Sequence, residues 1–489
     1  MLFNSHEFIF IFLPITFIIY FFLLSKKLII GAKGFLVFAS LFFYSWWNIV
    51  YLPLILTSMF FNYVIGNSLN NNKEKVTIKI RKRNLLIFGI VANLTLLGYF
   101  KYADFFLSNI NYINNVNIEL LNLALPLAIS FFTFQQIAYL VDSYRQETSE
   151  YDFLNYALFV TFFPQLIAGP IVHHQEMIPQ FSSRWNLVKN YKNIALGLFI
   201  FGIGLFKKVV IADTFAVWAT NGFDKAEVLS LIEAWVTSLS YTFQLYFDFS
   251  GYTDMAIGIA LLFNIKLPIN FNSPYKARNI QDFWRRWHIT LSRFLRDYIY
   301  IPLGGNKISS FKTYSNLMVT FILGGLWHGA GWTFVFWGFL HGFSLVIHRF
   351  WQTLGFKLNS IIAWVITFNF VNIAWVFFRA KEWEDAIKVL NGMFGFSGIS
   401  LPSILENKLS FLSDYGVLFN GLMPSIEGSK ETLFLIIIFL FIVTISKNSN
   451  EIMKLYARNK LYLVIISFIF TFAILSIVKA KSEFLYFNF

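Results

Sequence analysis

The sequence predicts an all-α, polytopic integral membrane protein, and three observations support this prediction. First, 57% of its 489 residues are hydrophobic and only 13% are charged, and a soluble protein cannot cover that much apolar surface with so few charges. Second, the 62 Phe are spread over the whole length, so the apolar character is not confined to one anchor. Third, apolar stretches recur at the length of about 20 residues that a spanning helix needs.

Because several of these stretches are short or carry Gly, Pro or charge, we expect roughly 11 to 14 membrane-embedded helices. The first stretch has no basic leader and no cleavage site, which predicts a retained helix and not a signal peptide. A further stretch, 251–266, follows a Ser-Gly pair and predicts a short or re-entrant helix. The candidate spans are 8–25, 35–51, 52–67, 84–101, 120–140, 153–172, 193–211, 229–247, 313–330, 332–350, 360–378, 431–446 and 461–478.

Basic loops predict the orientation, because Lys and Arg gather on the cytoplasmic side. The segment 73–83 carries six basic residues against one acid, and Lys26, Lys27 and Lys33 mark a second inner loop. These loops place the N-terminus outside, and the basic segment 447–460 places the preceding segment outside as a partly folded loop. The C-terminus would also lie outside. We therefore divide the chain into N-terminal spans (1–115), a core (116–380), an external loop (381–430) and C-terminal spans (431–489).

The formal charge of +13 does not indicate nucleic-acid binding. Basic loops that meet anionic lipid headgroups explain it, and no zinc-knuckle or RNA-binding pattern is present. The chain has no cysteine, which excludes thiol catalysis, iron–sulfur clusters, Cys-ligated zinc and disulfides.

The first functional candidate is His288, the last residue of an Asp-Phe-Trp-Arg-Arg-Trp-His run. At 100° per residue, residues 282–299 form an amphipathic helix with an Arg-rich polar face, as in a helix that lies in the membrane interface. His288 falls inside the apolar arc near its edge and is expected to point into the protein. The predicted apolar arc consists of Phe283, Trp284, Trp287, Leu291, Phe294, Leu295, Tyr298 and Ile299.

Two roles remain open for this helix. It can be an interfacial anchor in which His288 is satisfied by a hydrogen bond. Alternatively, Arg285 and Arg286, with Trp284 and Trp287, can also hold an anionic donor such as the phosphates of a coenzyme A, since the Arg fork suits phosphate oxygens.

The second candidate is His328, which follows Trp327 in a Gly-Gly-Leu-Trp-His-Gly run. Glycines around it let backbones or a substrate approach closely. A neutral imidazole in such a cavity can take the proton of a hydroxyl as that hydroxyl attacks an acyl carbonyl. The alternative is a histidine packed in a helix crossing. No GxSxG motif is present, which argues against a serine acyl-enzyme within this chain.

Polar residues within apolar stretches are also candidates. Asp248 and Asp254 flank the Ser-Gly pair and could relay protons, pair with Lys or Arg, orient a histidine or cap a helix, while Gln135 indicates a polar-lined interior. The other histidines give weaker signals. His173 and His174 are expected in a loop, His341 and His348 lie further along a helix, and His6 is terminal. Since no pair has a carboxylate on the same face at metal-ligand spacing, we expect no metal.

Several motifs together resemble the membrane-bound O-acyltransferases, and specifically the bacterial branch that acetylates polysaccharides such as alginate, peptidoglycan and cellulose. The resemblance covers about residues 120 to 350, and the order and spacing of its motifs make it specific. The motifs are SFFTFQQIAYLVDSYR (130–145), FFPQLIAGPI (162–171), YFDFSGYTDMAIG (246–258), NFNSPYKARNIQDFWRRWHITLSRFLRDYIYIPLGGN (270–306) and LGGLWHGAGWTFVFWGFLHG (323–342).

This resemblance implies a ring of helices around a thin central region, where a funnel from each side meets near two histidines. The family's invariant histidine maps onto His328 as base or proton shuttle, and its second motif histidine onto His288, which would orient or polarise the donor. Acetyl would come from cytoplasmic acetyl-CoA, with no bound cofactor, and pass to an exported partner with a serine-hydrolase-like (SGNH) domain that esterifies an extracytoplasmic glycan. The expected location is the bacterial cytoplasmic (inner) membrane.

Three other functions are kept as alternatives. A related branch transfers D-alanine to teichoic acid. The residues of the two histidine motifs favour the polysaccharide branch over this one. A transporter or flippase would fit the buried Asp residues, although no inverted repeat is found. A scaffold for a secretion complex would explain the helices and not the Trp-His motifs.

Overall fold

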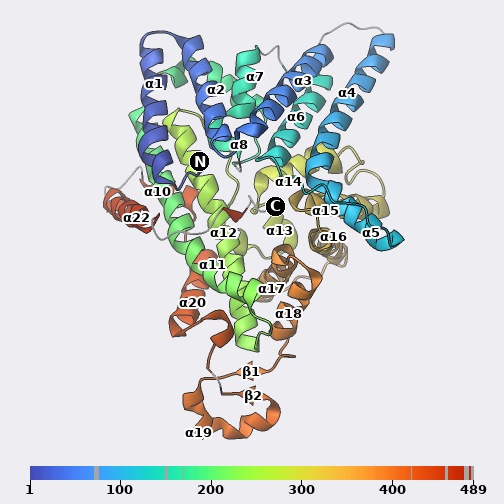
Figure 1. Cartoon of the computed structure of the whole chain (residues 1–489), viewed down its shortest axis with the longest axis vertical. Helices are drawn as coiled ribbons and strands as arrows, with labels where there is room; N and C mark the ends of the chain where they lie inside the picture. The colour runs from blue at the N-terminus through green and yellow to red at the C-terminus, as the bar shows by residue number, and fades with distance from the viewer. Residues whose placement is uncertain are drawn as a thin grey trace. The chain divides into compact units, whose positions relative to one another are not determined.

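The computed structural model describes residues 1–70, 76–148, 152–167, 169–419, 421–456, 461–477 and 484–485. Within these ranges nearly all regular structure is helical, as Figure 1 shows, so the predicted all-α membrane fold is confirmed. The chain groups into two compact units. The first contains Met1–Leu205, Tyr252–Ile269 and Tyr456–Phe470, and the second contains Phe206–Gly251, Asn270–Leu455 and Thr471–Phe489. The predicted division of the chain into four segments remains a prediction. The two units group residues by their contacts and do not indicate on which side of the membrane a segment lies.

The first unit begins as a bundle of apolar helices, drawn blue to cyan in Figure 1. The π-helix η1 (Glu7–Phe12) leads into α1, where Pro14 occupies the first turn, a position that needs no backbone donor. The other helices here are α2 (Ile29–Ser45), α3 (Leu52–Asn70), α4 (Val76–Leu97), α5 (Ala103–Asn114), α6 (Ile129–Tyr144), α7 (Phe153–Thr161), α8 (Phe163–Leu166), α9 (His174–Ser182) and α10 (Tyr191–Phe206), with α1 at Leu13–Ser25.

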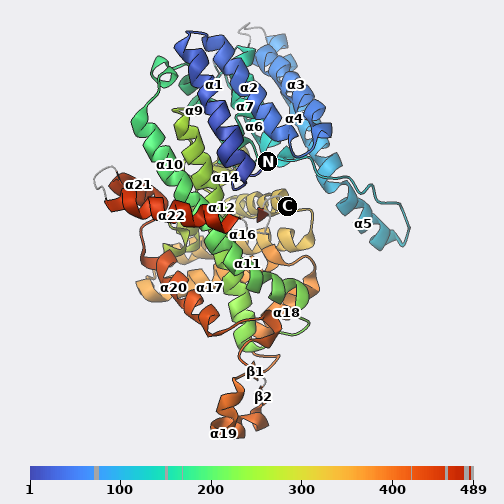
Figure 2. The ribbon, with the colours of Figure 1, turned by 60° about the vertical axis from the view of Figure 1, so that its left-hand side comes forward.

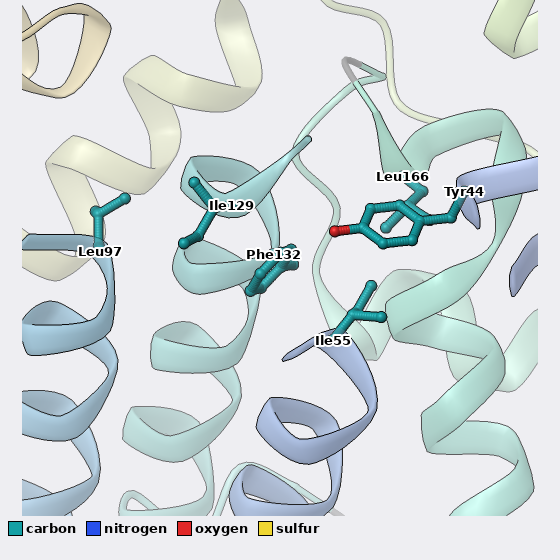
Figure 3. Packing of buried hydrophobic residues seen from close by; sticks show 6 residues of the cluster. All are labelled: Tyr44, Ile55, Leu97, Ile129, Phe132 and Leu166. Atoms are coloured by element: carbon teal, nitrogen blue, oxygen red, sulfur yellow. The ribbon is translucent and has the colours of Figure 1, made fainter. Parts of the chain in front are cut away.

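An apolar cluster holds this bundle together (Figure 3). It brings together side chains of α2, α3, α4, α6 and α8, each at most 4% exposed. Beside it, buried amides join three helices: the side chains of Asn62 and Asn93 exchange hydrogen bonds of 3.1 and 2.7 Å, and Asn62 also donates to Gln136. Such polar bonds fix which helices associate where the lipid offers no partner. The cluster consists of Tyr44, Ile55, Leu97, Ile129, Phe132 and Leu166.

The second unit contains the helices that follow α10 in sequence. Its two short strands, β1 (Ile399–Ser400) and β2 (Val417–Leu418), pair in parallel and project with α19 (Glu406–Leu409) beyond α18 and α20 in Figure 2. The other elements include η5 (Lys207–Ala212), α11 (Asp213–Thr220), α13 (Ile280–Trp284), α14 (Ile289–Leu295), α15 (Ser310–His328), α16 (Trp332–Thr353), α17 (Ser360–Arg379), α18 (Trp383–Met393), α20 (Lys430–Ile445) and α21 (Ser449–Tyr456). The helices α12 (Leu231–Leu262) and α22 (Leu461–Ile477) are divided between the two units.

Most predicted spans overlap helices, although residues 120–128 of the predicted span 120–140 precede α6 and are not helical. The stretch 251–266 does not form a separate helix, because α12 continues without interruption through Ser250 and Gly251 to Leu262. Ser and Gly inside a helix cost only about 1 kcal/mol relative to Ala, and these two positions are buried. Helical capping at this point is excluded for the same reason.

Five helical segments of the described chain are long and apolar enough to cross a membrane, or six if α20 and the segment after it form one bent span. They include Glu7–Ser25 and the continuous segment Tyr191–Lys225. Other predicted spans are interrupted. The stretch 153–172, for example, divides at Phe162, whose ψ of 107° ends α7 before α8. The chain is therefore a multi-pass membrane protein, and the count of 11 to 14 embedded helices remains a prediction.

Candidate active site

The segment around His288 is not the single helix predicted for 282–299. It consists of α13, a tight connection, α14 and the π-helix η8 (Arg296–Tyr300). The interruption is at His288, which adopts a left-handed conformation with φ 42° and ψ 54°. A periodicity argument could not detect it, because a residue with positive φ leaves the apolar spacing of its neighbours almost unchanged. For a non-glycine residue this conformation costs about 1–2 kcal/mol and needs support from its surroundings.

The predicted apolar arc is nevertheless largely confirmed. Six of its eight members are buried, and Tyr298 and Ile299 are intermediate. His288 itself is fully buried at 0% exposure, as expected from its place on that arc. The break at His288 turns α14 away from α13 while both helices keep their apolar faces inward.

A single asparagine supports the strained histidine. The Oδ1 of Asn270 accepts hydrogen bonds from the backbone N–H of Thr290 at 3.2 Å and from its hydroxyl at 3.0 Å, and it lies 3.1 Å from Nδ1 of His288. Since this oxygen is an acceptor, Nδ1 of His288 carries the hydrogen and Nε2 carries the lone pair. Burial lowers the pKa of His288 to about 3, so the ring is neutral. The sequence predicted His288, whereas Asn270 was missed, because it lies 18 residues upstream in a loop.

His328 is the last residue of α15, and its ring centroid lies 6.3 Å from that of His288. It is 4% exposed and packs edge-on against Trp337 and Phe378, at centroid distances of 5.2 and 5.0 Å. Trp327 contacts both histidine rings, at 4.9 Å from His328 and 6.3 Å from His288. The structure therefore brings together the two histidines that the motifs predicted, inside an aromatic enclosure.

Glycines allow this packing because they let α15 and α16 touch backbone to backbone. A Cβ on Gly325 would lie 2.2 Å from the carbonyl oxygen of Phe334, and one on Gly338 would lie 2.3 Å from that of Phe321. Neither oxygen can move without shifting a helix. The crossing is thus the close helix contact that small residues permit in membranes, and it sets Trp337 of α16 against His328 of α15.

His341 belongs to the same aromatic enclosure, although the sequence argument ranked it as a weak candidate. It is fully buried on α16, accepts a 3.2 Å hydrogen bond at Nδ1 from Nε1 of Trp284, and lies 4.7 Å from the Trp337 ring. The spacing of Trp337 and His341, four residues apart on one helix face, was the available signal. Trp287 packs 4.9 Å from Trp375 of α17, which adds a second face to the enclosure.

The two predicted donor-binding arginines differ in their surroundings. Arg286 is engaged, because its Nε donates to Asp282 at 2.9 Å and its Nη1 to the carbonyl of Asn272 at 3.3 Å. Arg285 is exposed, and within the described part of the chain no ion pair or hydrogen bond is found for it. Of the two, Arg285 is therefore the one whose fork can meet an anion, and donor binding stays a prediction for both, as it does for Trp284, Trp287 and Trp327.

Asp248 belongs to a buried ion cluster. Its Oδ1 lies 2.7 Å from Nζ of Lys208, which also contacts Asp213 at 2.9 Å, and its Oδ2 accepts from the backbone N–H of Leu485 at 3.0 Å. Of the roles left open for Asp248, pairing with a lysine is thus confirmed. Gln135 and Asp254 are buried in the first unit, and their predicted roles in binding the donor stay predictions.

A second histidine cluster lies in the first unit, where the spacing argument against a metal does not hold. His174 begins α9 and His173 precedes it, and both rings reach the carboxylate of Asp142 on α6. Spacing along one helix could not reveal this cluster, because Asp142 belongs to a different helix. The expectation that the chain binds no metal stays a prediction at this point.

In the second unit, two imidazole rings lie near each other in buried, aromatic surroundings. A neutral imidazole with a fixed tautomer can accept the proton of an attacking hydroxyl or thiol group, and the aromatic walls exclude water that would compete as a nucleophile. No serine hydrolase motif is needed for such a direct transfer. The site therefore has the features of a histidine-dependent acyl-transfer centre.

Comparison with known proteins agrees with this chemistry. Residues 9–381 match the model of the membrane-bound O-acyltransferase family. The peptidoglycan O-acetyltransferase of Helicobacter pylori is 52% identical, over 100% of this chain and 98% of that protein. The probable alginate O-acetylase of Pseudomonas aeruginosa is 41% identical, over 84% of this chain and 78% of that protein. The teichoic acid D-alanyltransferase of Bacillus subtilis is 28% identical, over 54% of this chain and 71% of that protein.

Proposed function

Because the chain belongs to the membrane-bound O-acyltransferase family, we propose that it takes acetyl groups from acetyl-CoA in the cytoplasm and delivers them across the membrane for O-acetylation of peptidoglycan. That it is a membrane O-acyltransferase of the polysaccharide O-acetylation branch follows from the family and from the named relatives. The donor, the direction across the inner membrane and the particular glycan belong to the proposal.

Peptidoglycan is favoured over alginate by the extent of similarity. The relative named for peptidoglycan is 52% identical over the full chain, whereas the relative named for alginate is 41% identical over 84% of it. Acetyl is favoured over D-alanine because the relative named for teichoic acid covers only 54% of the chain at 28% identity. A transporter or scaffold role has no comparable support.

The single observation that carries the mechanism is the pair of His288 and His328, whose rings lie 6.3 Å apart in a buried aromatic enclosure. In the proposed step, the acceptor oxygen attacks the acetyl carbonyl carbon while His328 takes the hydroxyl proton. The C–S bond of the thioester then breaks, and the imidazolium returns the proton to the departing sulfur. Each turnover forms one ester and one thiol, with no oxidant or reductant.

His288 was expected to orient or polarise the donor, and its surroundings favour a different contribution. A neutral ring whose Nδ1–H points to Asn270 offers a lone pair at Nε2 and no second N–H for an acyl carbonyl. We therefore assign His288 to accepting a hydrogen bond at Nε2 next to His328, which orients a reacting group. Arg285, which is exposed, is the residue proposed to meet the phosphates of the donor.

The proposed acceptor on the outer side is the serine of an exported, serine-hydrolase-like acetyltransferase, which then esterifies the glycan. Two findings support the proposal of a partner. The described residues form helices apart from one two-stranded sheet, and the sequence has no GxSxG motif for a glycan-acetylating serine.

The test measures ester-linked acetate on purified peptidoglycan from cells that carry the wild-type protein, His328→Ala, or no protein. His348→Ala is the matched control, because His348 lies on α16 and contacts Gln352 on the same helix. We expect acetate to fall equally in His328→Ala and the deletion, and to persist in the control. Unchanged peptidoglycan acetate in the deletion would overturn the acceptor assignment, and loss of D-alanine esters instead would favour the teichoic acid alternative.

A further inference from the structure

The cluster of Asp142, His173 and His174 is built by two helices of the first unit. Asp142 lies in the last turn of α6, and the two histidines form the start of α9. Oδ2 of Asp142 is 2.9 Å from Nε2 of His174 and 3.4 Å from Nδ1 of His173. The three potential ligand atoms all lie within 4.8 Å of one another.

We propose that these three side chains bind a divalent transition metal ion, with zinc the ion that fits best. The donor set is two imidazole nitrogens and one carboxylate oxygen, which is the borderline set that zinc accepts alongside sulfur ligands. Calcium and magnesium are disfavoured because they prefer oxygen-rich sites. The inference does not depend on the proposed acetyl transfer.

Two of the three distances between the donor atoms are close to what a tetrahedral ion requires. Zinc bonds of about 2.0–2.1 Å at tetrahedral angles place neighbouring ligand atoms roughly 3.3 Å apart. The two separations from Oδ2, 2.9 and 3.4 Å, lie on either side of this value, and the two imidazole nitrogens lie within 4.8 Å of each other. An ion between the three atoms would draw the two imidazole rings together around Asp142.

The surroundings of the cluster orient one carboxylate oxygen of Asp142 toward the ring nitrogens of His173 and His174. Arg145 lies 4.0 Å from Oδ1 of Asp142, the other carboxylate oxygen, so that Oδ2 is the one facing both imidazoles. Asp142 and His174 have side chains only 1% exposed, whereas that of His173 is 23% exposed. The partly exposed His173 thus gives the ion a path from solvent, and a water would be the fourth ligand, as in three-residue zinc sites.

A bound ion would fasten the end of α6 to the start of α9. Hydrogen bonds already hold residues next to both ends, from Gln146 to the carbonyl of Leu69 at 3.0 Å and from Gln175 to the carbonyl of Glu147 at 3.1 Å. Since α3 ends at Asn70, directly before the predicted cytoplasmic loop, the ion would come from the cytoplasm. Without an ion, the same groups form hydrogen bonds, so the site is formed before the metal binds.

The experiment uses the full-length protein in detergent, purified through a tag that contains no histidine. The protein is stripped with a chelator, dialysed against micromolar zinc, and its bound metal is measured by mass spectrometry, together with its thermal midpoint before and after zinc. We expect about one zinc per chain and an increase in Tm of a few degrees for the wild type, because a ligand that binds only the folded state raises its stability.

Five variants decide the assignment. Asp142→Asn and His174→Gln should lose the bound zinc and the rise in Tm, whereas His6→Gln and His348→Gln, which replace histidines outside the cluster, should retain both. His173→Gln changes a partly exposed position, so it tests the proposal even if the variants at buried positions fail to accumulate. Its zinc affinity should fall at least tenfold. Equal zinc in wild type and His173→Gln, or no binding by the wild type at 100 μM zinc, would overturn the proposal.

Discussion

The chain buries histidines in two places that differ in the groups beside them. In the second unit, the partners of His288 and His328 are an amide oxygen and aromatic rings. In the first unit, both imidazoles of His173 and His174 face one carboxylate. An amide orients an imidazole and leaves it neutral, so that it can take up a proton during a reaction. A carboxylate stabilises positive charge, whether that of a protonated ring or of a bound cation.

The difference teaches that burial alone does not indicate what a histidine does. His288 and His174 are 0% and 1% exposed, so their exposure does not distinguish the role proposed for His288 in acyl transfer from the metal binding proposed for His174. The neighbouring acceptor separates them, and that acceptor is far away in sequence in both cases. The following predictions test how sharply the two environments divide the two roles.

The largest effect is expected from His328→Ala. Removal of a general base lowers rates by about 10²- to 10⁴-fold, so acetylation by membranes that contain the variant should fall at least 100-fold with unchanged protein levels. Acetyl transfer from acetyl-CoA to an added acceptor measures the rate. Activity within threefold of wild type would show that His328 is not the general base. The contrast between the two histidine environments would then no longer hold.

Gly338→Ala should affect the protein next most strongly. The added Cβ would lie 2.3 Å from the carbonyl oxygen of Phe321, and overpacking of this kind costs about 1–3 kcal/mol, or more where backbone must move. The yield of folded protein in detergent, measured by size-exclusion chromatography, and the midpoint of its thermal unfolding should both be lower than in the wild type. Gly331→Ala is the control, because the nearest atom to its Cβ is 3.6 Å away, and it should behave as wild type.

Asn270→Asp would place a carboxylate beside His288, as Asp142 places one beside His173 and His174 in the first unit. A carboxylate beside Nδ1 of His288 would stabilise the imidazolium, so that Nε2 holds a hydrogen and no longer accepts one. Acetylation should fall about 10- to 100-fold, the usual effect of changing a group that orients a functional histidine. Asn272→Asp adds the same charge at an exposed position and should retain activity. If both variants behave alike, charge near the site matters and the tautomer does not.

The smallest effect is expected from Trp284→Phe, which removes the hydrogen bond to Nδ1 of His341 and retains an aromatic ring. Leaving a buried acceptor unsatisfied costs about 1–3 kcal/mol, so the thermal midpoint should fall by several degrees. A change in stability with acetylation reduced less than threefold would assign His341 to structure. A large loss of activity at unchanged stability would place it in the chemistry.

Much of the fold and part of the site could be predicted from the sequence. Apolar runs located most helices because lipid leaves helices as the main spanning structure available to a single apolar segment. The Trp-His motifs identified His288 and His328, since a buried imidazole is costly unless it is used. The break at His288 was missed because it depends on Asn270, 18 residues away. The cluster at Asp142 was missed because it forms only when α6 and α9 pack together.

The ion cluster of Lys208, Asp213 and Asp248 has a consequence for how the chain is made. Lys208 lies in the segment Tyr191–Lys225, which is long and apolar enough to cross a membrane. A lysine at the centre of a spanning helix costs about 2.5–3.5 kcal/mol during insertion. Lys208 pairs with two carboxylates, those of Asp213 and Asp248. When this segment leaves the ribosome, only Asp213 has been synthesised. Asp248 arrives with α12, and the backbone N–H of Leu485 becomes available to Asp248 only after a further 237 residues have been synthesised. The charge environment of Lys208 is therefore completed in stages, first by Asp213, then by Asp248, and then by the backbone donor that holds Asp248 in place.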